Sequence, residues 1–112
     1  MPKPATRTYS RYSREAAKLL GLAIRQGRIE RQLTLEELAE RAGISRGLLQ
    51  RIERGDMGCA IGPVFETAAI VGIRLFDADQ ADLTRRIATT EKTLALLPHA
   101  VHPSKSGVKD DF

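Results

Sequence analysis

Residues 34–55 read TLEELAERAGISRGLLQRIERG, and their pattern predicts two short amphipathic helices joined by a tight three-residue turn. Thr34 is placed to cap the first helix, and Glu37 three residues later completes a capping box. Gly43 is expected to end that helix, because glycine accepts the left-handed conformation needed at a helix exit. Ser45 is placed to cap the second helix.

Each of these two helices has one apolar face. The residues that we expect to pack between them are Leu38, Ala39, Ala42, Ile44, Leu48, Leu49 and Ile52. The small Ala39 allows a close crossing. The outer face of the second helix carries Arg46, Gln50, Arg51 and Arg54. A polar, arginine-bearing helix held in this way against a small-residue partner is the helix-turn-helix arrangement.

The rest of the chain predicts three further helices. The first spans residues 13–31, with Ser13 as its cap and one face formed by Ala17, Leu20, Ile24 and Arg28. Another begins near Ile61, has Pro63 in its first turn, where the missing N–H is harmless, and ends at Gly72. The last spans residues 79–97, with Asp77 or Asp79 as its cap and apolar positions at Leu83, Ile87, Leu94 and Leu97.

Two connecting segments complete the expected fold. Gln32 stands where a helix exit needs the left-handed conformation, and Ile73, Leu75 and Phe76 predict a short extended segment. We therefore expect an all-α, five-helix domain over residues 14–97. A flexible basic arm, residues 1–13, precedes it, and a flexible tail, residues 98–112, follows Pro98.

Composition restricts the function further. Hydrophobic residues make up 42% of the 112 residues, which is enough for one small core, and no apolar run reaches transmembrane length. The N-terminal stretch has no apolar segment typical of a secretory signal. A single cysteine cannot form an internal disulfide, so we expect a cytoplasmic protein.

The net charge of +4 is unevenly distributed along the chain. Residues 1–13 carry three bases and no acid, and residues 14–62 carry nine bases and seven acids. Residues 63–97 carry four bases and five acids, and the remainder is balanced. The basic excess thus coincides with the arm and the helix-turn-helix half, which is the polarity that a phosphate-binding face requires.

Residues 20–76 resemble the XRE family of DNA-binding domains, the phage-repressor and Cro-like five-helix fold. The strings that carry the resemblance are IRQGRIERQLTLEELAERAG, ISRGLLQRIERGD and GIRLF. By this resemblance, Arg46 and Arg51 read base edges, while Ser45 and Gly47 allow close backbone approach. Arginine can donate two parallel hydrogen bonds to guanine O6 and N7. Gly47 departs from the family pattern, since many relatives have a polar base-reading residue there; it implies either a close approach of the helix or one fewer base contact.

Other positions are expected to contact the DNA backbone. The free N–H groups at Thr34 and Leu35 form a natural phosphate seat, and Arg54 closes the second helix. The resemblance also implies that Arg28 pairs with Glu53, with a possible phosphate contact by Arg28 as well. Asp56 would repel phosphate unless it is turned away. In the arm, the residues expected to meet phosphates or a minor groove are Lys3, Arg7 and Arg11.

Catalytic and metal sites are not expected, and neither is a cofactor. Cys59 has no adjacent histidine and falls where helix packing begins. His99 and His102 have metal-like spacing but are flanked by prolines and lack a third ligand. The acidic residues Glu36, Glu37 and Glu40 are expected to form a solvated helix face.

The leading interpretation is a sequence-specific repressor that binds an inverted repeat in double-stranded DNA as a homodimer. A narrower resemblance is to HipB-type antitoxins, which repress their own operon and bind HipA-like serine/threonine kinase toxins. It rests on RIERGDMGCAIGPVFETAAIVGI, one further helix, and a tail of the form LP…VHPSK…VKDDF. The alternatives are a stand-alone XRE-family regulator and a pure protein-interaction module. RNA is disfavoured, because A-form major grooves do not admit a helix.

Overall fold

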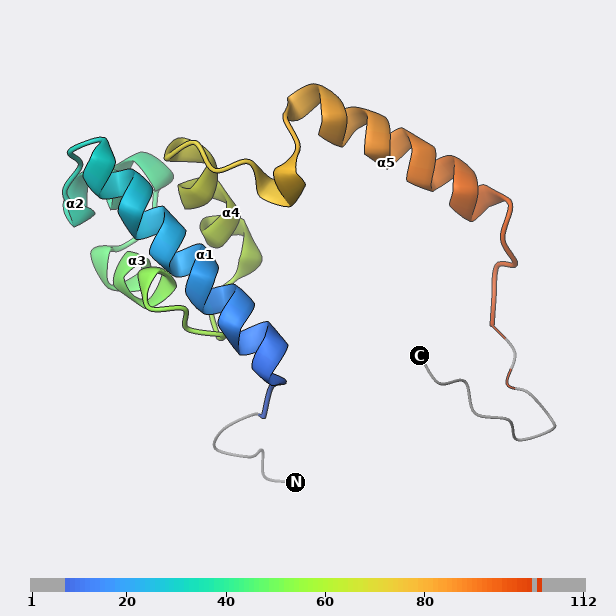
Figure 1. Ribbon diagram of the computed structural model, residues 1–112, viewed down its shortest axis with the longest axis horizontal. Coiled ribbons are helices and arrows are strands. Elements are labelled where there is room, and N and C mark those ends of the chain that lie inside the picture. Colours follow the sequence, from blue (N-terminus) through green and yellow to red (C-terminus); the bar gives the residue numbers. More distant parts are fainter. Residues whose placement is uncertain (1–7, 102, 104–112) are drawn as a thin grey trace. The chain divides into compact units, whose positions relative to one another are not determined.

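The computed structural model describes residues 8–101 and residue 103. Within these residues the chain is helical and has no strand, as expected for the all-α fold (Figure 1). The elements are α1 (Arg11–Glu30), α2 (Leu35–Ala42), α3 (Arg46–Glu53), α4 (Ile61–Ile70), the 3-10 helix η1 (Leu75–Asp77) and α5 (Gln80–Ala95). No described helix is both long enough and apolar enough to cross a bilayer.

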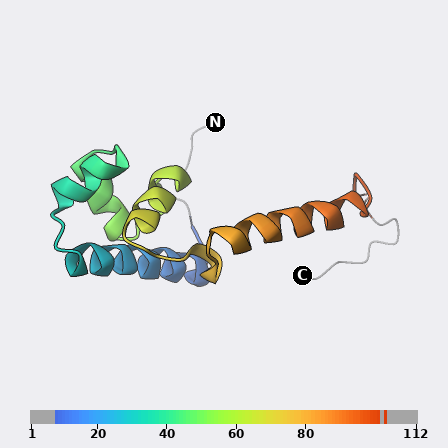
Figure 2. The ribbon, with the colours of Figure 1, turned by 90° about the horizontal axis from the view of Figure 1, so that it is seen from above.

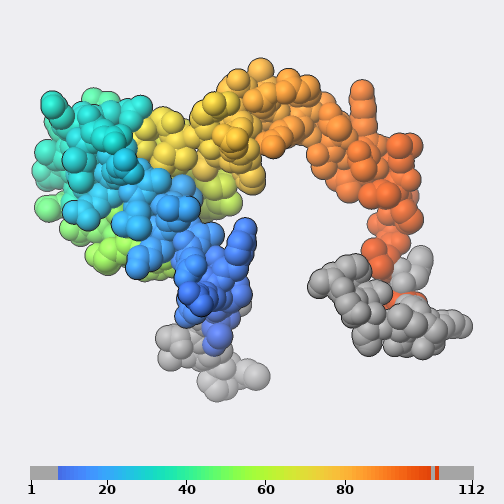
Figure 3. Space-filling model, in the orientation of Figure 1, coloured from blue at the N-terminus to red at the C-terminus, as the bar shows by residue number. Residues whose placement is uncertain are grey.

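The chain divides into two compact units after Asp77, and α5 belongs to the second. In the first unit, α1 packs on α3 and α4, and α2 packs on the same two helices. Figure 2 shows α1 lying along one side of α2, α3 and α4. Side chains fill the spaces between the ribbons (Figure 3).

The core of this unit is small and aliphatic. Ile24, Leu38 and Leu49 are fully buried, and the residues packed with them are Ala39, Ile52, Ala68 and Val71. Five of these seven positions lie on the apolar faces predicted from the sequence. The one fully buried polar side chain of the described residues, Thr67, donates its hydroxyl to the Pro63 and Val64 carbonyl oxygens within α4.

The helix-turn-helix turn forms as predicted. Thr34 Oγ1 accepts the Glu37 N–H at 3.0 Å, and Glu37 Oε1 accepts the Thr34 N–H at 2.8 Å. Gly43 has φ 72°, in the left-handed region, and ends α2. Ser45 Oγ then accepts the Leu48 N–H at 3.0 Å and starts α3. Gln32 also adopts the expected left-handed conformation, with φ 58°.

A close crossing of α1 and α3 depends on Gly21, which the sequence analysis did not single out. A Cβ built at this position would lie 2.5 Å from the Ile52 carbonyl oxygen and 2.7 Å from that of Glu53. Any side chain would therefore force the two helix backbones apart. This contact fixes how α3 is held on α1, and so fixes which faces of both helices adjoin.

The first helix begins earlier than predicted. Its cap is Ser10, whose Oγ accepts the Ser13 N–H at 3.1 Å, so Ser13 lies in the first turn instead of preceding it. Arg11 pairs with Glu15 one turn later, at 3.0 Å, and such a pair stabilises an added turn. Arg11 is thus a residue of α1 and not of an arm. Lys3 and Arg7 lie outside the described residues.

The prediction of an extended segment at residues 73–76 is wrong. Leu75–Asp77 form a 3-10 turn in which Phe76 and Asp77 have φ 57° and 53°. The Phe76 ring meets the Phe65 ring edge-on, with centroids 6.4 Å apart, and this contact favours the turned backbone over an extended one. Helix α4 begins at Ile61 as predicted, and Gly72 ends its last turn with φ 83°.

Helix α5, described by itself, has a reciprocal cap but no core. Asp79 Oδ1 accepts the Asp82 N–H at 2.8 Å, so Asp79 and not Asp77 is the cap. No residue of the helix is buried. Ile87 and Leu94, two of the predicted apolar positions, are 57% and 61% exposed. Most of the predicted tail, residue 102 and residues 104–112, lies outside the described residues.

Candidate nucleic-acid interface

Helix α3 separates its residues into two faces. Leu49, Ile52 and Glu53 are buried against the first unit. The residues on the exposed side include Ser45 at the cap and, in order, Arg46, Gly47, Arg51 and Arg54. All four residues predicted to approach bases are therefore accessible to a groove of DNA. The arginines bring donors that suit guanine, and the chain offers few aromatic rings for base stacking.

Gly47 stands out because nothing in the protein requires it. A Cβ built there would meet no atom within 4 Å among the described residues. Glycine in an exposed helix costs about 0.5–1 kcal/mol relative to alanine. Gly47 thus lowers the stability of α3 without filling a packing role among the described residues, as Gly62 does in α4.

Arg51 is held in place by the loop that follows α3. Its Nε donates to Asp56 Oδ2 at 2.9 Å, and Asp56 Oδ1 accepts the Gly58 N–H at 2.7 Å. The hydrogen bond from Arg51, and then that from the Gly58 N–H, keep the pKa of the Asp56 carboxyl below its usual range. The same contact with Asp56 raises the pKa of Arg51. Asp56 is thus turned onto Arg51, and its charge is largely compensated.

The contact with Asp56 still leaves Arg51 able to bind a base. Only Nε of its guanidinium is engaged by the described residues, so the two terminal nitrogens are available as donors. These two nitrogens form the end of the guanidinium that can donate in parallel to guanine O6 and N7. The side chain is 45% exposed, as this role requires.

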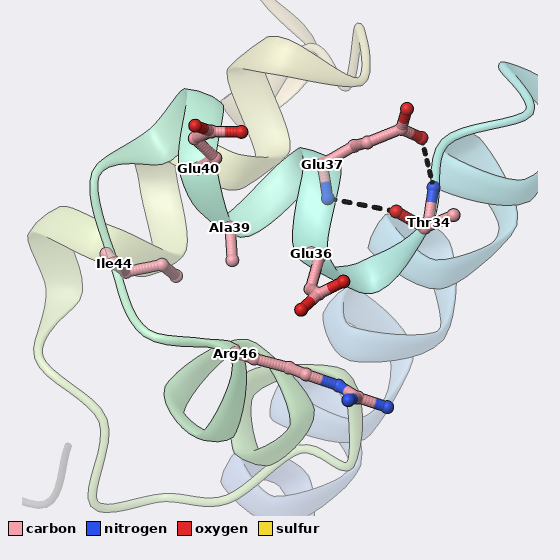
Figure 4. A pocket seen from close by; sticks show the side chains of 7 residues that line it. All are labelled: Thr34, Glu36, Glu37, Ala39, Glu40, Ile44 and Arg46. Atoms are coloured by element: carbon pink, nitrogen blue, oxygen red, sulfur yellow. Dashed lines mark hydrogen bonds between the residues drawn. The ribbon is translucent and has the colours of Figure 1, made fainter.

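The beginning of α2 offers less to a phosphate than the sequence analysis expected. The Thr34 N–H is already bonded to Glu37, whose carboxylate has its pKa lowered chiefly by that backbone hydrogen bond (Figure 4). The N–H groups of the next helical residues, starting with Leu35, are the ones that lack an acceptor by helix geometry. A phosphate seat here therefore depends on Leu35 and the Thr34 hydroxyl.

An acidic hollow of about 710 Å³ adjoins α2 and the start of α3. Its lining residues are Thr34, Glu36, Glu37, Ala39, Glu40, Ile44 and Arg46. In Figure 4, Ala39 and Ile44 point into the space between the helices, and Arg46 extends on the side of Glu36. Three carboxylates against one guanidinium give this hollow a net negative charge. The predicted acidic face of α2 thus borders the proposed base-reading helix.

The guanidinium of Arg28 is hydrogen-bonded to other residues of the protein. Its Nε and Nη2 donate to the Glu53 carboxylate at 2.7 and 3.1 Å, and its Nη1 donates to the Leu33 carbonyl oxygen at 3.0 Å. The two side chains are 11% and 7% exposed. All three nitrogens of the guanidinium therefore make a hydrogen bond within the protein, and these bonds fix α1 on α3.

A second hollow, of about 470 Å³, lies between α1 and α3 and is basic. Its lining residues are Lys18, Leu22, Arg25, Arg28, Leu35, Gln50, Glu53 and Arg54. Arg28, Leu35 and Arg54 were predicted from the sequence to have a role, whereas Lys18 and Arg25 were not. Their spacing of seven residues, which places both on one face of α1, was the available signal.

The remaining candidates are Cys59 and the two histidines near the C-terminal end. Cys59 is half-buried, and burial raises the pKa of its thiol, which disfavours the thiolate nucleophile. His99 is exposed, and its proposed metal-binding companion His102 lies outside the described residues. Within the described part of the chain, no group of three or more histidine, cysteine or acidic residues could hold a metal ion.

The geometry of α2 and α3 agrees with a comparison against known families. Residues 24–58 match the family model described as helix-turn-helix. The matched range begins in α1, contains α2, the turn and α3, and ends at the loop that holds Arg51. It supports a DNA-binding transcription regulator. No curated protein matches the chain.

Proposed function

We propose that this helix-turn-helix protein is a sequence-specific repressor that inserts α3 into the major groove of DNA. The observation that carries the proposal is the exposed face of α3, where Gly47 leaves room beside two arginines. Arg46 and Arg51 donate to base edges, Ser45 and Gly47 allow close approach, and Leu35, Thr34 and Arg54 contact phosphates. The predicted basic side chains before α1, Lys3 and Arg7, would add contacts independent of sequence.

In vitro selection from a random duplex library tests this proposal. The wild-type protein should enrich one motif, and Gly47→Ala should bind that motif more weakly although it unfolds at higher temperature. The helix gains propensity while the groove-facing surface gains a methyl group. Gly62→Ala, at the equally open helical position in α4, is the control for the gain in stability. Enrichment of no motif by the wild-type protein would contradict sequence-specific binding.

We further propose that the repressor acts as a homodimer on an inverted repeat, because one such module reads few bases. The exposed apolar side chains of α5 support a role in pairing: Ile87 and Leu94 lie on one face and would cost solvation if left uncovered. Sedimentation should show a dimer for the wild type. Ile87→Lys should shift it to monomer, whereas Thr89→Lys, about half a turn away, should not.

The narrower proposal is that the chain is the antitoxin of a HipBA-like system, acting in the cytoplasm on its own operon. Its support is the resemblance over residues 51–73 and in the tail, with α5 and the tail assigned to a HipA-like kinase. The kinase encoded next to this gene should co-purify with the full chain and lose activity in the complex. A chain ending at Leu97 should keep DNA binding and lose affinity for the kinase. If no such kinase binds, the stand-alone regulator is the better description.

A further inference from the structure

The basic hollow between α1 and α3 brings together side chains that are far apart in sequence. Lys18 and Arg25 come from α1, and Arg54 comes from the end of α3. Gly55 fixes this juxtaposition, because a Cβ on it would lie 2.8 Å from the Lys18 Cα. The chain after α3 therefore passes close to the backbone of α1 at Lys18, and Lys18 and Arg54 both line the hollow.

The charge of this hollow is not compensated from within. Glu53 is its one acidic lining residue, and that carboxylate is already paired with both donors of the Arg28 fork. The side chains of Lys18 and Arg25 make no hydrogen bond or ion pair with any other residue that the structure describes, and both residues are exposed. Lys18, Arg25 and Arg54 thus line an open hollow, and the two other charged residues of its lining, Arg28 and Glu53, neutralise each other. An anion entering it would meet no unpaired carboxylate of the lining.

The hollow also adjoins the proposed DNA-binding helix. Its lining includes Leu35, the first residue of α2, and Gln50, one turn beyond Arg46 on α3. A duplex that receives α3 in its major groove carries a phosphate backbone along each edge of that groove. The edge on the α1 side would run along this hollow, whereas the acidic hollow borders α3 toward α2.

We infer that Lys18 and Arg25, together with Arg54, form a site for the phosphate backbone of the bound duplex and draw α1 into the DNA interface. The inference rests on the proposed function, since it takes α3 as the helix in the groove. Contacts of this kind set affinity and register but carry no sequence information. Lys18 and Arg25 would therefore contribute equally to binding of every sequence, in contrast to Arg46 and Arg51.

The test is the salt dependence of binding by Lys18→Gln/Arg25→Gln. Two duplexes are used, one selected by the wild-type protein and one of unrelated sequence. On both duplexes, the negative slope of log K against log salt should become shallower by about 0.9 for each phosphate that the variant no longer neutralises. The control, Arg31→Gln/Arg74→Gln, removes the same charge from exposed side chains outside the lining and should leave the slope near that of the wild type.

The outcomes separate this inference from the proposed function. An unchanged slope for Lys18→Gln/Arg25→Gln, with the selected motif still preferred, overturns the phosphate site and leaves the repressor intact. An equal decrease in the control shows a general charge effect and also overturns the site. Loss of preference for the motif, at an unchanged slope, would assign the two side chains to base reading. If the wild type selects no duplex, the proposed function fails first. Thermal melting of each variant checks that it folds.

Discussion

Two hollows border α3, and they carry opposite charge. The hollow toward α2 has three glutamates against Arg46, whereas the hollow toward α1 has Lys18, Arg25 and Arg54 around an internally paired Arg28 and Glu53. The small net positive charge of this unit does not reveal that contrast. If α3 lies in a groove of DNA, this contrast favours phosphate contacts along the α1 side of the helix over contacts beside the three glutamates. The contrast in charge would also favour one orientation of α3 relative to the two DNA strands.

The largest effect, a loss of stability, is expected from breaking the ion pair between Arg28 and Glu53 in the lining of the basic hollow. Arg28→Met leaves Glu53 as an uncompensated buried charge, so the free energy of unfolding should fall by about 3–5 kcal/mol. Denaturant unfolding monitored by circular dichroism measures it. The double change Arg28→Met/Glu53→Leu should recover most of this stability, since it removes both charges. If Arg28→Met were as stable as the wild type, Glu53 would not depend on Arg28 to compensate its buried charge.

The sequence could predict the parts of this site that depend on neighbouring residues. The capping box, Gly43 and Ser45 are local signals, because each satisfies hydrogen bonds or a backbone conformation within one turn. The hollows depend on which helix faces adjoin, and that is set by the contact of Gly21 with the Ile52 carbonyl oxygen, 31 positions away. Nothing in the local pattern reports this contact. The spacing of Lys18 and Arg25 places both on one face of α1, but it does not show that this face adjoins α3.

The next largest effect is expected on DNA affinity when the proposed base-reading residues between the two hollows are replaced. Arg46→Ala and Arg51→Ala should each weaken binding to the selected motif by about 1–3 kcal/mol and relax the preference at one base pair. Both side chains are exposed, so folding should be retained. Quantitative binding to a set of single-base variants of the motif measures the change, with Arg74→Ala as the control. Full affinity and preference in either variant would contradict the assigned role of α3.

Neutralising the acidic hollow should act in the opposite direction to neutralising the basic one. Glu36→Gln/Glu40→Gln removes repulsion near the backbone, so affinity for all duplexes should rise several-fold at low salt and less at high salt. Preference among sequences should not change, because neither side chain is assigned a base contact. Glu30→Gln/Glu66→Gln, outside the hollow, is the control. Equal increases in affinity in both double variants would remove the distinction between the hollows.

The smallest effect concerns Asp56, which holds Arg51. Asp56→Asn keeps an acceptor for the Gly58 N–H but loses the charge-assisted bond to Arg51, so preference at the base pair read by Arg51 should weaken. Affinity for unrelated DNA should rise slightly, because one negative charge is gone. Binding to single-base variants measures both, and Glu66→Gln is the control for charge. Preserved preference at that base pair would show that Arg51 needs no support.

The lowered pKa of Asp56 predicts how the bond between Asp56 and Arg51 depends on pH. Because its pKa is lowered in the folded protein, the bond to Arg51 is fully present above the ordinary aspartate pKa of about 3.9 and is lost as the pH falls through the lowered value. Preference at the Arg51 base pair should therefore be constant from neutral to mildly acidic pH. A decline near neutral pH would point to a different titrating group.

The shortness of α3 has a consequence for the abundance of the protein. A helix of eight residues is not stable alone in water, so its outer face exists only while the inner face is packed on the core. Folding and binding are then linked by mass action: a ligand at one hundred times its dissociation constant stabilises the folded state by about 2.7 kcal/mol. Bound DNA would slow the turnover of the protein by proteases that attack unfolded chains, and free protein would be removed sooner. If α3 binds DNA as we propose, the lifetime of the protein would in this way depend on the occupancy of its target.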